Sequence, residues 1–254
     1  HEAAHHAQWM LKTAEAAVVL NEGLAVFIGG GHYFTQPLPE RAAALYRLGL
    51  VRPLLDLDRS DPERIHEAKY LEAAGFVAYL VERYGWEQFL QFYTTVLEDN
   101  FANQKWATWL AGSLQENFNI TVGRLEREYF AWLGAIDPGE QVDNLRLTLR
   151  LQEARRAYQF WHAPFLEVYA LGNLAEIEQL SLLTREDNSP EAVAIETLIQ
   201  SAQMAVFQGD SPAAEAMLAD IEHFLATGAF DRPLAAAYLS VARTLDEWGY
   251  EAQK

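Results

Sequence analysis

The sequence contains no cysteine, which excludes disulfide bonds and thiolate metal ligands. Basic residues are also scarce: 19 Lys and Arg stand against 36 Asp and Glu, giving a formal net charge of −17 at pH 7. A surface that binds nucleic-acid phosphates needs clustered Lys and Arg, and this composition argues against one. No apolar run reaches the length of about 18 residues that crosses a membrane, so the sequence predicts no transmembrane segment.

An initiator methionine is absent as well, because the chain begins at His1, and no signal peptide precedes the first motif. We therefore expect the chain to be a segment of a longer protein. Half of its residues are hydrophobic, which is enough for a packed core throughout. The length of 254 residues allows one large domain or two small ones.

The first five residues, His1-Glu2-Ala3-Ala4-His5, form an H-E-x-x-H pattern. Residues four apart lie on one face of a helix, so His1 and His5 can direct two imidazoles toward one point. Zinc accepts imidazole nitrogen, and a catalytic zinc site has three protein ligands and an open position for water. Glu2 is placed to take a proton from that water. The alternative is a helix with surface histidines, His6 among them.

A third zinc ligand is predicted at Glu22, which lies 17 residues after His5. Apart from Asn21, the residues around this acid are apolar, and a carboxylate in such a run is costly to bury unless it is paired or bound to metal. The spacing allows one helix to end near residues 12–13 and a second helix to run back beside it. Such a turn would bring Glu22 to the histidines.

These two segments resemble the gluzincin zinc metallopeptidases, namely the aminopeptidase-N-like family and, more closely, the bacterial peptidase MA-like domains. In these proteins H-E-x-x-H is followed by a stretch similar to W-L-x-E-G-x-A. The stretch 20–25, L-N-E-G-L-A, is similar to it, although Val19 stands at the Trp position and the spacing is about two residues shorter. The resemblance implies Zn²⁺ held by His1, His5 and Glu22, with Glu2 as the proton acceptor.

Downstream, the stretch 70–80 resembles the aminopeptidase pattern Y-x-K-G-x-x-V-x-x-x-L. The Tyr of that pattern donates a hydrogen bond to the oxyanion of the tetrahedral intermediate, and the resemblance assigns this role to Tyr70. The Lys and Gly of the pattern are replaced by Glu72 and Ala73. The alternative for Tyr70 is a core aromatic at helical spacing with Phe76 and Val77.

Helical periodicity predicts an all-α chain. In the first half we expect helices over 1–11, 14–28, 40–48, 62–84, 86–98 and 104–117, with another after Thr121. The glycines 29–31 end the second of these, although they could instead form a mobile rim with His32 and Tyr33 near the substrate. Gly134 and the Asp137-Pro138-Gly139 break place a domain boundary between 1–136 and 137–254.

The second half carries no chemical motif. A long helix is expected from 144, although its leucines alternate as in a strand, followed by helices near 165–184, 190–208, 212–227 and 233–249. Ser189-Pro190, Ser211-Pro212 and Arg232-Pro233 mark three of the starts. The helices around 194–207 and 213–225 resemble one tetratricopeptide-like hairpin. We expect this half to cover the catalytic helices, to form a dimer contact or to bind a protein partner.

The sequence thus predicts the helical half of a thermolysin-like (gluzincin) domain, whose β-sheet lies upstream, followed by a helical-hairpin domain. The expected function is zinc-dependent hydrolysis of peptide bonds in a peptide or protein substrate, through a metal-activated water. The segment alone is expected to be inactive, because the missing sheet holds the substrate backbone. The alternative is an inactive pseudo-peptidase, or a helical interaction module, that retains the zinc motif. Family resemblance favours a location outside the cytoplasm.

Overall fold

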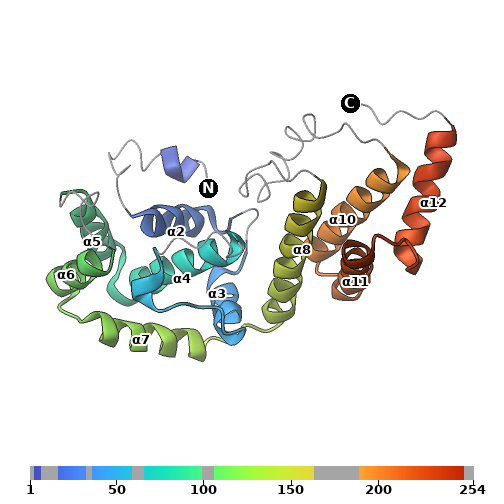
Figure 1. Cartoon of the computed structure of the whole chain (residues 1–254). Helices are drawn as coiled ribbons and strands as arrows, with labels where there is room; N and C mark the ends of the chain where they lie inside the picture. The colour runs from blue at the N-terminus through green and yellow to red at the C-terminus, as the bar shows by residue number, and fades with distance from the viewer. Residues whose placement is uncertain are drawn as a thin grey trace. The chain divides into compact units, whose positions relative to one another are not determined.

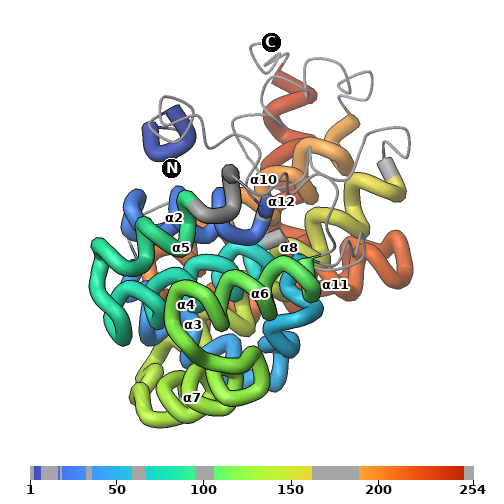
Figure 2. The backbone as a smooth tube through the Cα atoms, turned by 90° about the vertical axis from the view of Figure 1, so that its left-hand side faces the viewer, coloured from blue at the N-terminus to red at the C-terminus, as the bar shows by residue number. Residues whose placement is uncertain are grey.

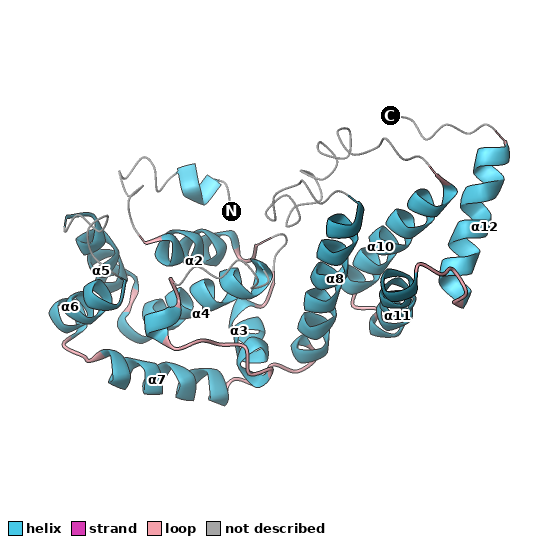
Figure 3. Cartoon of the chain, in the orientation of Figure 1, coloured by secondary structure: helices cyan, strands magenta, loops and turns pink. Residues whose placement is uncertain are grey.

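The structure is a computed structural model, and it describes residues 3–6, 17–32, 36–58, 66–98, 106–162 and 189–248. Within these ranges the regular secondary structure is helical and no strand occurs (Figure 3), which confirms the all-α prediction. The chain divides into two compact units, His1–Val142 and Asp143–Lys254. The division falls shortly after the break at residues 137–139, from which the domain boundary was predicted.

The first unit is built around α4. Residues 3–6 are helical, and the elements that follow are α2 (Val18–Gly29), α3 (Leu38–Arg47), the short 3₁₀ helix η1 (Leu54–Asp56), α4 (His66–Tyr84), α5 (Trp86–Glu98), α6 (Trp106–Phe118) and α7 (Val122–Ala135). In both views α4 lies between α2 and α7 (Figures 1 and 2). Side chains 71–80 of α4 are all buried, so this helix is covered on several sides at once.

The core of the first unit is aromatic. Phe76 of α4 contacts Tyr129 of α7 edge-on, with ring centroids 5.9 Å apart, and Phe92 of α5 lies 5.4 Å from Trp109 of α6. Leu20 and Leu24 of α2 belong to the same cluster. Large aromatic side chains each bury considerable area, so a few such contacts are enough to hold short helices together.

The glycine run after α2 ends that helix, as the first of its two interpretations predicted. Gly30 adopts the left-handed conformation with φ 69°, and its N–H donates to the carbonyl of Phe27. The N–H of Gly31 donates to the carbonyl of Val26. Glycine has no Cβ to oppose a positive φ, so it is the residue that best ends a helix in this way. Tyr33, which the second interpretation invoked, lies outside the described residues.

The second unit contains most of α8 (Gln141–His162), together with α10 (Pro190–Gln208), α11 (Ser211–Thr227) and α12 (Pro233–Glu247). Its core joins Leu147 and Leu151 of α8 to Leu198 of α10 and Leu218 of α11. The alternating leucines of α8 are therefore helical, as predicted. The helix expected over 165–184 lies outside the described residues.

The starts of the helices in the second unit depend on carboxylates and one hydroxyl. The Ser189 hydroxyl accepts from the N–H of Ala192 at 3.2 Å, as the Ser-Pro signal predicted. α11 begins one residue earlier than predicted, because Asp210 rather than Ser211 is its N-cap and accepts from Ala213. Among the described helices, none is both long and apolar enough to cross a membrane.

Candidate metal centre

Two of the three predicted zinc ligands meet in the structure. His5, in the helical segment 3–6, directs its Nε2 toward Oε2 of Glu22 on α2, at 3.2 Å. Their side chains are 29% and 26% exposed, so both are partly accessible to solvent. The neighbouring His6 is exposed. The third predicted ligand, His1, and the predicted base, Glu2, lie outside the described residues.

The separation of these two side chains fits a shared metal ion. Ligand atoms about 2.0–2.2 Å from a tetrahedral zinc are on the order of 3.3–3.5 Å from each other. The observed 3.2 Å between His5 Nε2 and Glu22 Oε2 is close to this separation. It also fits a direct ion pair between a protonated imidazole and the carboxylate, which at this exposure would stabilise the fold by about 1 kcal/mol or less. The imidazole nitrogen and the carboxylate oxygen are both atoms that zinc binds.

Glu22 is positioned by an unusually close approach of α2 to α4. A Cβ added at Gly23 would lie 2.6 Å from the carbonyl oxygen of Ala73, so only glycine fits here without a shift of backbone. On the other side of Glu22, Asn21 accepts a hydrogen bond of 2.6 Å from the hydroxyl of Tyr93 on α5. The residues on both sides of the predicted ligand are thus fixed against neighbouring helices.

Tyr70, the predicted oxyanion donor, lies half-buried on α4 with its ring stacked on His32. The centroids are 3.9 Å apart and the planes differ by 10°. The stack is compatible with both interpretations of Tyr70, namely the oxyanion donor and the core aromatic at helical spacing with Phe76 and Val77.

Glu67, one turn before Tyr70 on α4, forms a buried ionic cluster. Its Oε2 lies 3.4 Å from Nδ1 of His32, and its Oε1 accepts from Nη2 of Arg41 at 3.4 Å. Burial alone would raise the pKa of Glu67, but the His32 hydrogen bond and the Arg41 charge outweigh it and lower the pKa. Burial in turn lowers the pKa of Arg41, against the opposing pull of Glu67.

Glu72 and Ala73, at the positions where the aminopeptidase pattern has Lys and Gly, are both buried. Glu72 is buried, and its carboxylate accepts from both the backbone N–H and the guanidinium Nε of Arg52, the latter at 3.1 Å. It thereby ties the connector before η1 to α4. Ala73 belongs to the buried hydrophobic core cluster of the first unit. Both replacements serve packing of the first unit.

Sequence reasoning missed Glu67 and Arg41, and it named His32 only as part of a possible rim. A weak signal was present, because Arg41 begins the run Arg-Ala-Ala-Ala-Leu, whose other members are all buried. A lone cation in an apolar run calls for a carboxylate partner. The sequence could not name that partner, which lies 26 residues away.

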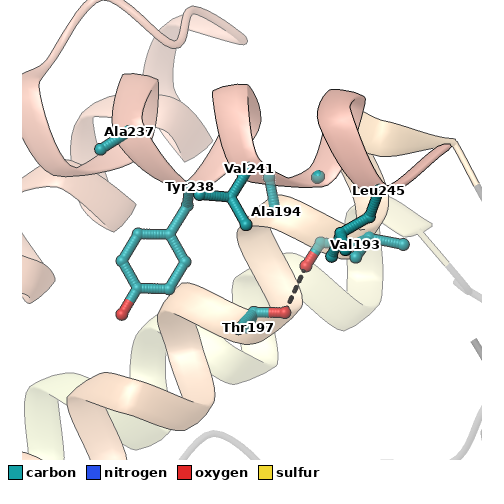
Figure 4. Close-up of a pocket in the computed structure, with 8 residues that line it drawn as sticks. Val193, Ala194, Thr197, Ala237, Tyr238, Val241 and Leu245 are labelled. Atoms are coloured by element: carbon teal, nitrogen blue, oxygen red, sulfur yellow. Dashed lines mark hydrogen bonds between the residues drawn. The ribbon is translucent and has the colours of Figure 1, made fainter. Parts of the chain in front are cut away.

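The second unit has an apolar pocket of about 240 Å³ between α10 and α12. It is lined by Val193, Ala194, Thr197, Ala237, Tyr238, Val241, Ala242 and Leu245 (Figure 4). The Thr197 hydroxyl donates to the Val193 carbonyl, and the Tyr238 hydroxyl donates to Ser201. Both hydroxyls are thus engaged within the fold, and the lining residues include no carboxylate, imidazole, amine or thiol.

Comparison with known proteins identifies no relative of this chain: no family model matches it, and no match was found among curated proteins or solved structures. The features of this chain that suggest a function are therefore the two predicted zinc-binding segments and the contact between His5 and Glu22.

Proposed function

We propose that this chain carries the metal site and the helical half of a zinc-dependent metallopeptidase of the gluzincin type, which hydrolyses peptide bonds. His1, His5 and Glu22 would hold the zinc. The observation that carries the proposal is the 3.2 Å separation of His5 Nε2 and Glu22 Oε2, contributed by two motifs 17 residues apart.

Each side chain has a distinct task in the proposed reaction. Bound zinc supplies a Lewis acid that polarises a carbonyl and lowers the pKa of water toward about 7. Glu2 accepts a proton from the attacking water and passes it to the leaving amine. Tyr70 directs a phenolic O–H at the oxyanion that develops on the substrate carbonyl. Gly23 keeps α2, which carries Glu22, close against α4, which carries Tyr70.

Zinc stoichiometry is the first test of this proposal. We expect elemental analysis of the full-length parent protein to give about one zinc per chain, and both Glu22→Ala and His5→Ala to lose it. His6→Ala is the matched control, because it removes the adjacent, exposed imidazole and should keep the metal. A parent without zinc after reconstitution, or equal loss in the His5 and His6 variants, would contradict the proposed site.

The role of Glu2 is tested by hydrolysis. A Glu2→Gln variant of the full-length parent should still bind zinc but should lose peptide hydrolysis, because the amide cannot accept the proton of the water. The expected loss is on the order of 10²–10⁴-fold in kcat. A variant with both zinc and full activity would show that the proposed mechanism is wrong.

A second candidate is an inactive pseudo-peptidase or a helical interaction module. It is favoured by the use of Glu72 and Ala73 for packing, at positions where the aminopeptidase pattern has Lys and Gly. In this case His5 and Glu22 form only an ion pair. It predicts either no zinc, or bound zinc without hydrolysis, so the same two measurements distinguish the candidates.

We further propose that residues 137–254 form a tetratricopeptide-like helical domain that contacts a protein partner or a second copy of the chain. The hairpin of α10 and α11, joined through Gly209 and Asp210, supports this assignment. One hairpin is fewer than the three repeats that a stable solenoid normally needs.

A further inference from the structure

The strongest unassigned feature of the first unit is the cluster of His32, Glu67 and Arg41. Their side chains come from the loop after α2, from α4 and from α3, and they are only 7%, 1% and 2% exposed. Burying three ionisable groups stabilises a fold weakly or not at all, because desolvation offsets much of their attraction. The position of the cluster, directly against Tyr70, points instead to a role in holding that side chain.

The cluster forms a chain of contacts that ends at Tyr70. Arg41 Nη1 donates to Gln141 Oε1 and Arg41 Nη2 donates to Glu67, each at 3.4 Å. The other oxygen of Glu67 faces His32 Nδ1. An ionised carboxylate can only accept, so the hydrogen bond between His32 and Glu67 requires the tautomer in which His32 Nδ1–H is the donor.

The imidazole held in this way is the platform under the Tyr70 ring. With centroids 3.9 Å apart and planes within 10°, the two rings are in face-to-face contact. Such a contact favours the side-chain rotamer of Tyr70 in which the two rings are stacked. A hydrogen-bond donor acts on a transition state only when it is held close to its productive position in advance.

We propose that His32 and Glu67 are positioning residues for Tyr70: Glu67, clamped by Arg41, fixes the plane of the His32 imidazole, and His32 fixes the Tyr70 phenol. This inference rests on the proposed function, in which Tyr70 donates to the oxyanion. Neither His32 nor Glu67 contacts the substrate in this scheme.

The test uses a phosphinic peptide, whose tetrahedral PO₂⁻ group imitates the oxyanion, bound to the zinc-loaded full-length parent. Tyr70→Phe should weaken binding by about 10²-fold, the scale of one lost oxyanion donor. His32→Ala should weaken phosphinic-peptide binding by about tenfold when Tyr70 is present. It should have no effect in the Tyr70→Phe background, because His32 acts only through the Tyr70 hydroxyl. His32→Phe keeps a flat ring and should recover part of the affinity.

Glu67→Gln is compared with Glu72→Gln, because both acids are buried on α4 and paired with an arginine. Glu67→Gln should weaken phosphinic-peptide binding, whereas Glu72→Gln should not. The effect of Glu67→Gln should disappear in the Tyr70→Phe background. A readout independent of zinc is the NMR shift of the His32 ring protons in the metal-free chain. The stacked Tyr70 ring should move them upfield, and Tyr70→Leu should abolish that displacement.

The outcomes separate the two proposals. If the parent binds zinc and the phosphinic peptide, but His32→Ala keeps full affinity or loses it equally in the Tyr70→Phe background, the positioning role is overturned while the proposed function stands. Equal weakening by the Glu67 and Glu72 variants would also overturn it, because general destabilisation would then explain the effect. A parent that binds no zinc overturns the proposed function and this inference with it.

Discussion

At the scale of single residues, Glu67 shows how strongly neighbours decide the state of a buried acid. Its side chain is 1% exposed, which by itself would favour the neutral form. His32 and Arg41 reverse that preference and lower its pKa from the ordinary value of 4.5. Because the folded pKa lies below the unfolded one, Glu67 contributes stability that is complete above about pH 4.5 and is lost as the pH falls through the folded pKa.

We therefore predict that Glu67→Gln lowers the free energy of unfolding at pH 7, by up to about 3–5 kcal/mol if Arg41 is left without its counter-charge. The difference in the free energy of unfolding between Glu67→Gln and the parent should shrink as the pH falls below about 4.5. The parent then loses the stability that its ionised Glu67 contributes. Urea unfolding between pH 3 and pH 7 measures both curves. The exposed Glu87→Gln on α5 controls for the removal of one charge; parallel curves for the parent and Glu67→Gln would contradict the prediction.

At the scale of elements, the contact between α2 and α4 decides how the candidate site is held. The adjacent residues Glu22 and Gly23 of the predicted motif have different roles. Glu22 faces His5, while Gly23 lets the α2 backbone reach Ala73 of α4. A larger residue at Gly23 must push the two helices apart, and Glu22 would move with α2.

We predict that Gly23→Ala destabilises the chain although alanine is the better helix former. The intrinsic gain is about 0.8–1 kcal/mol, whereas overpacking against backbone typically costs about 1–3 kcal/mol. A net loss of up to about 2 kcal/mol is therefore expected from thermal or urea unfolding, together with weaker binding at the proposed zinc site. Gly112→Ala on α6 is the matched control, since a Cβ there meets nothing within 4 Å, and it should raise stability. A stabilised Gly23→Ala protein would show that the helices separate easily.

At the scale of the whole molecule, the net charge of −17 is the dominant electrostatic property. Like charges on a compact chain repel one another. Surface ion pairs oppose this only weakly, because exposed pairs such as Arg150 with Glu222 each contribute about 1 kcal/mol or less. Repulsion should therefore outweigh them at low ionic strength.

We predict that raising NaCl from about 0.01 M to about 0.1 M increases the Tm by a few degrees, since the Debye length falls from about 30 Å to about 10 Å. The effect should nearly vanish near pH 4.7, the isoelectric point, where the net charge is close to zero. Differential scanning calorimetry at both pH values is the measurement. A Tm that falls with salt at pH 7 would mean that ion pairs, and not repulsion, dominate.

Much of the fold was predictable because its signals are local. The helix from Pro190 follows from the Ser189 cap and the proline at its first position, and Gly30 ends α2 as expected. The predicted and observed bounds of α5 coincide. Helical periodicity and caps involve residues within one or two turns of each other, so the sequence alone carries them.

What the sequence determined by itself is therefore the helical class, most helix starts and stops, and the residues proposed to bind zinc. The tertiary structure decided the contacts between distant residues. The N-terminus of α12 is capped by Asp220 of α11, whose Oδ2 accepts from the N–H groups of Leu234 and Ala235. His32, Glu67 and Arg41 meet only because α2, α3 and α4 converge. No local pattern specifies such partners, because a buried charge requires a counter-charge in space and not at a fixed distance along the chain.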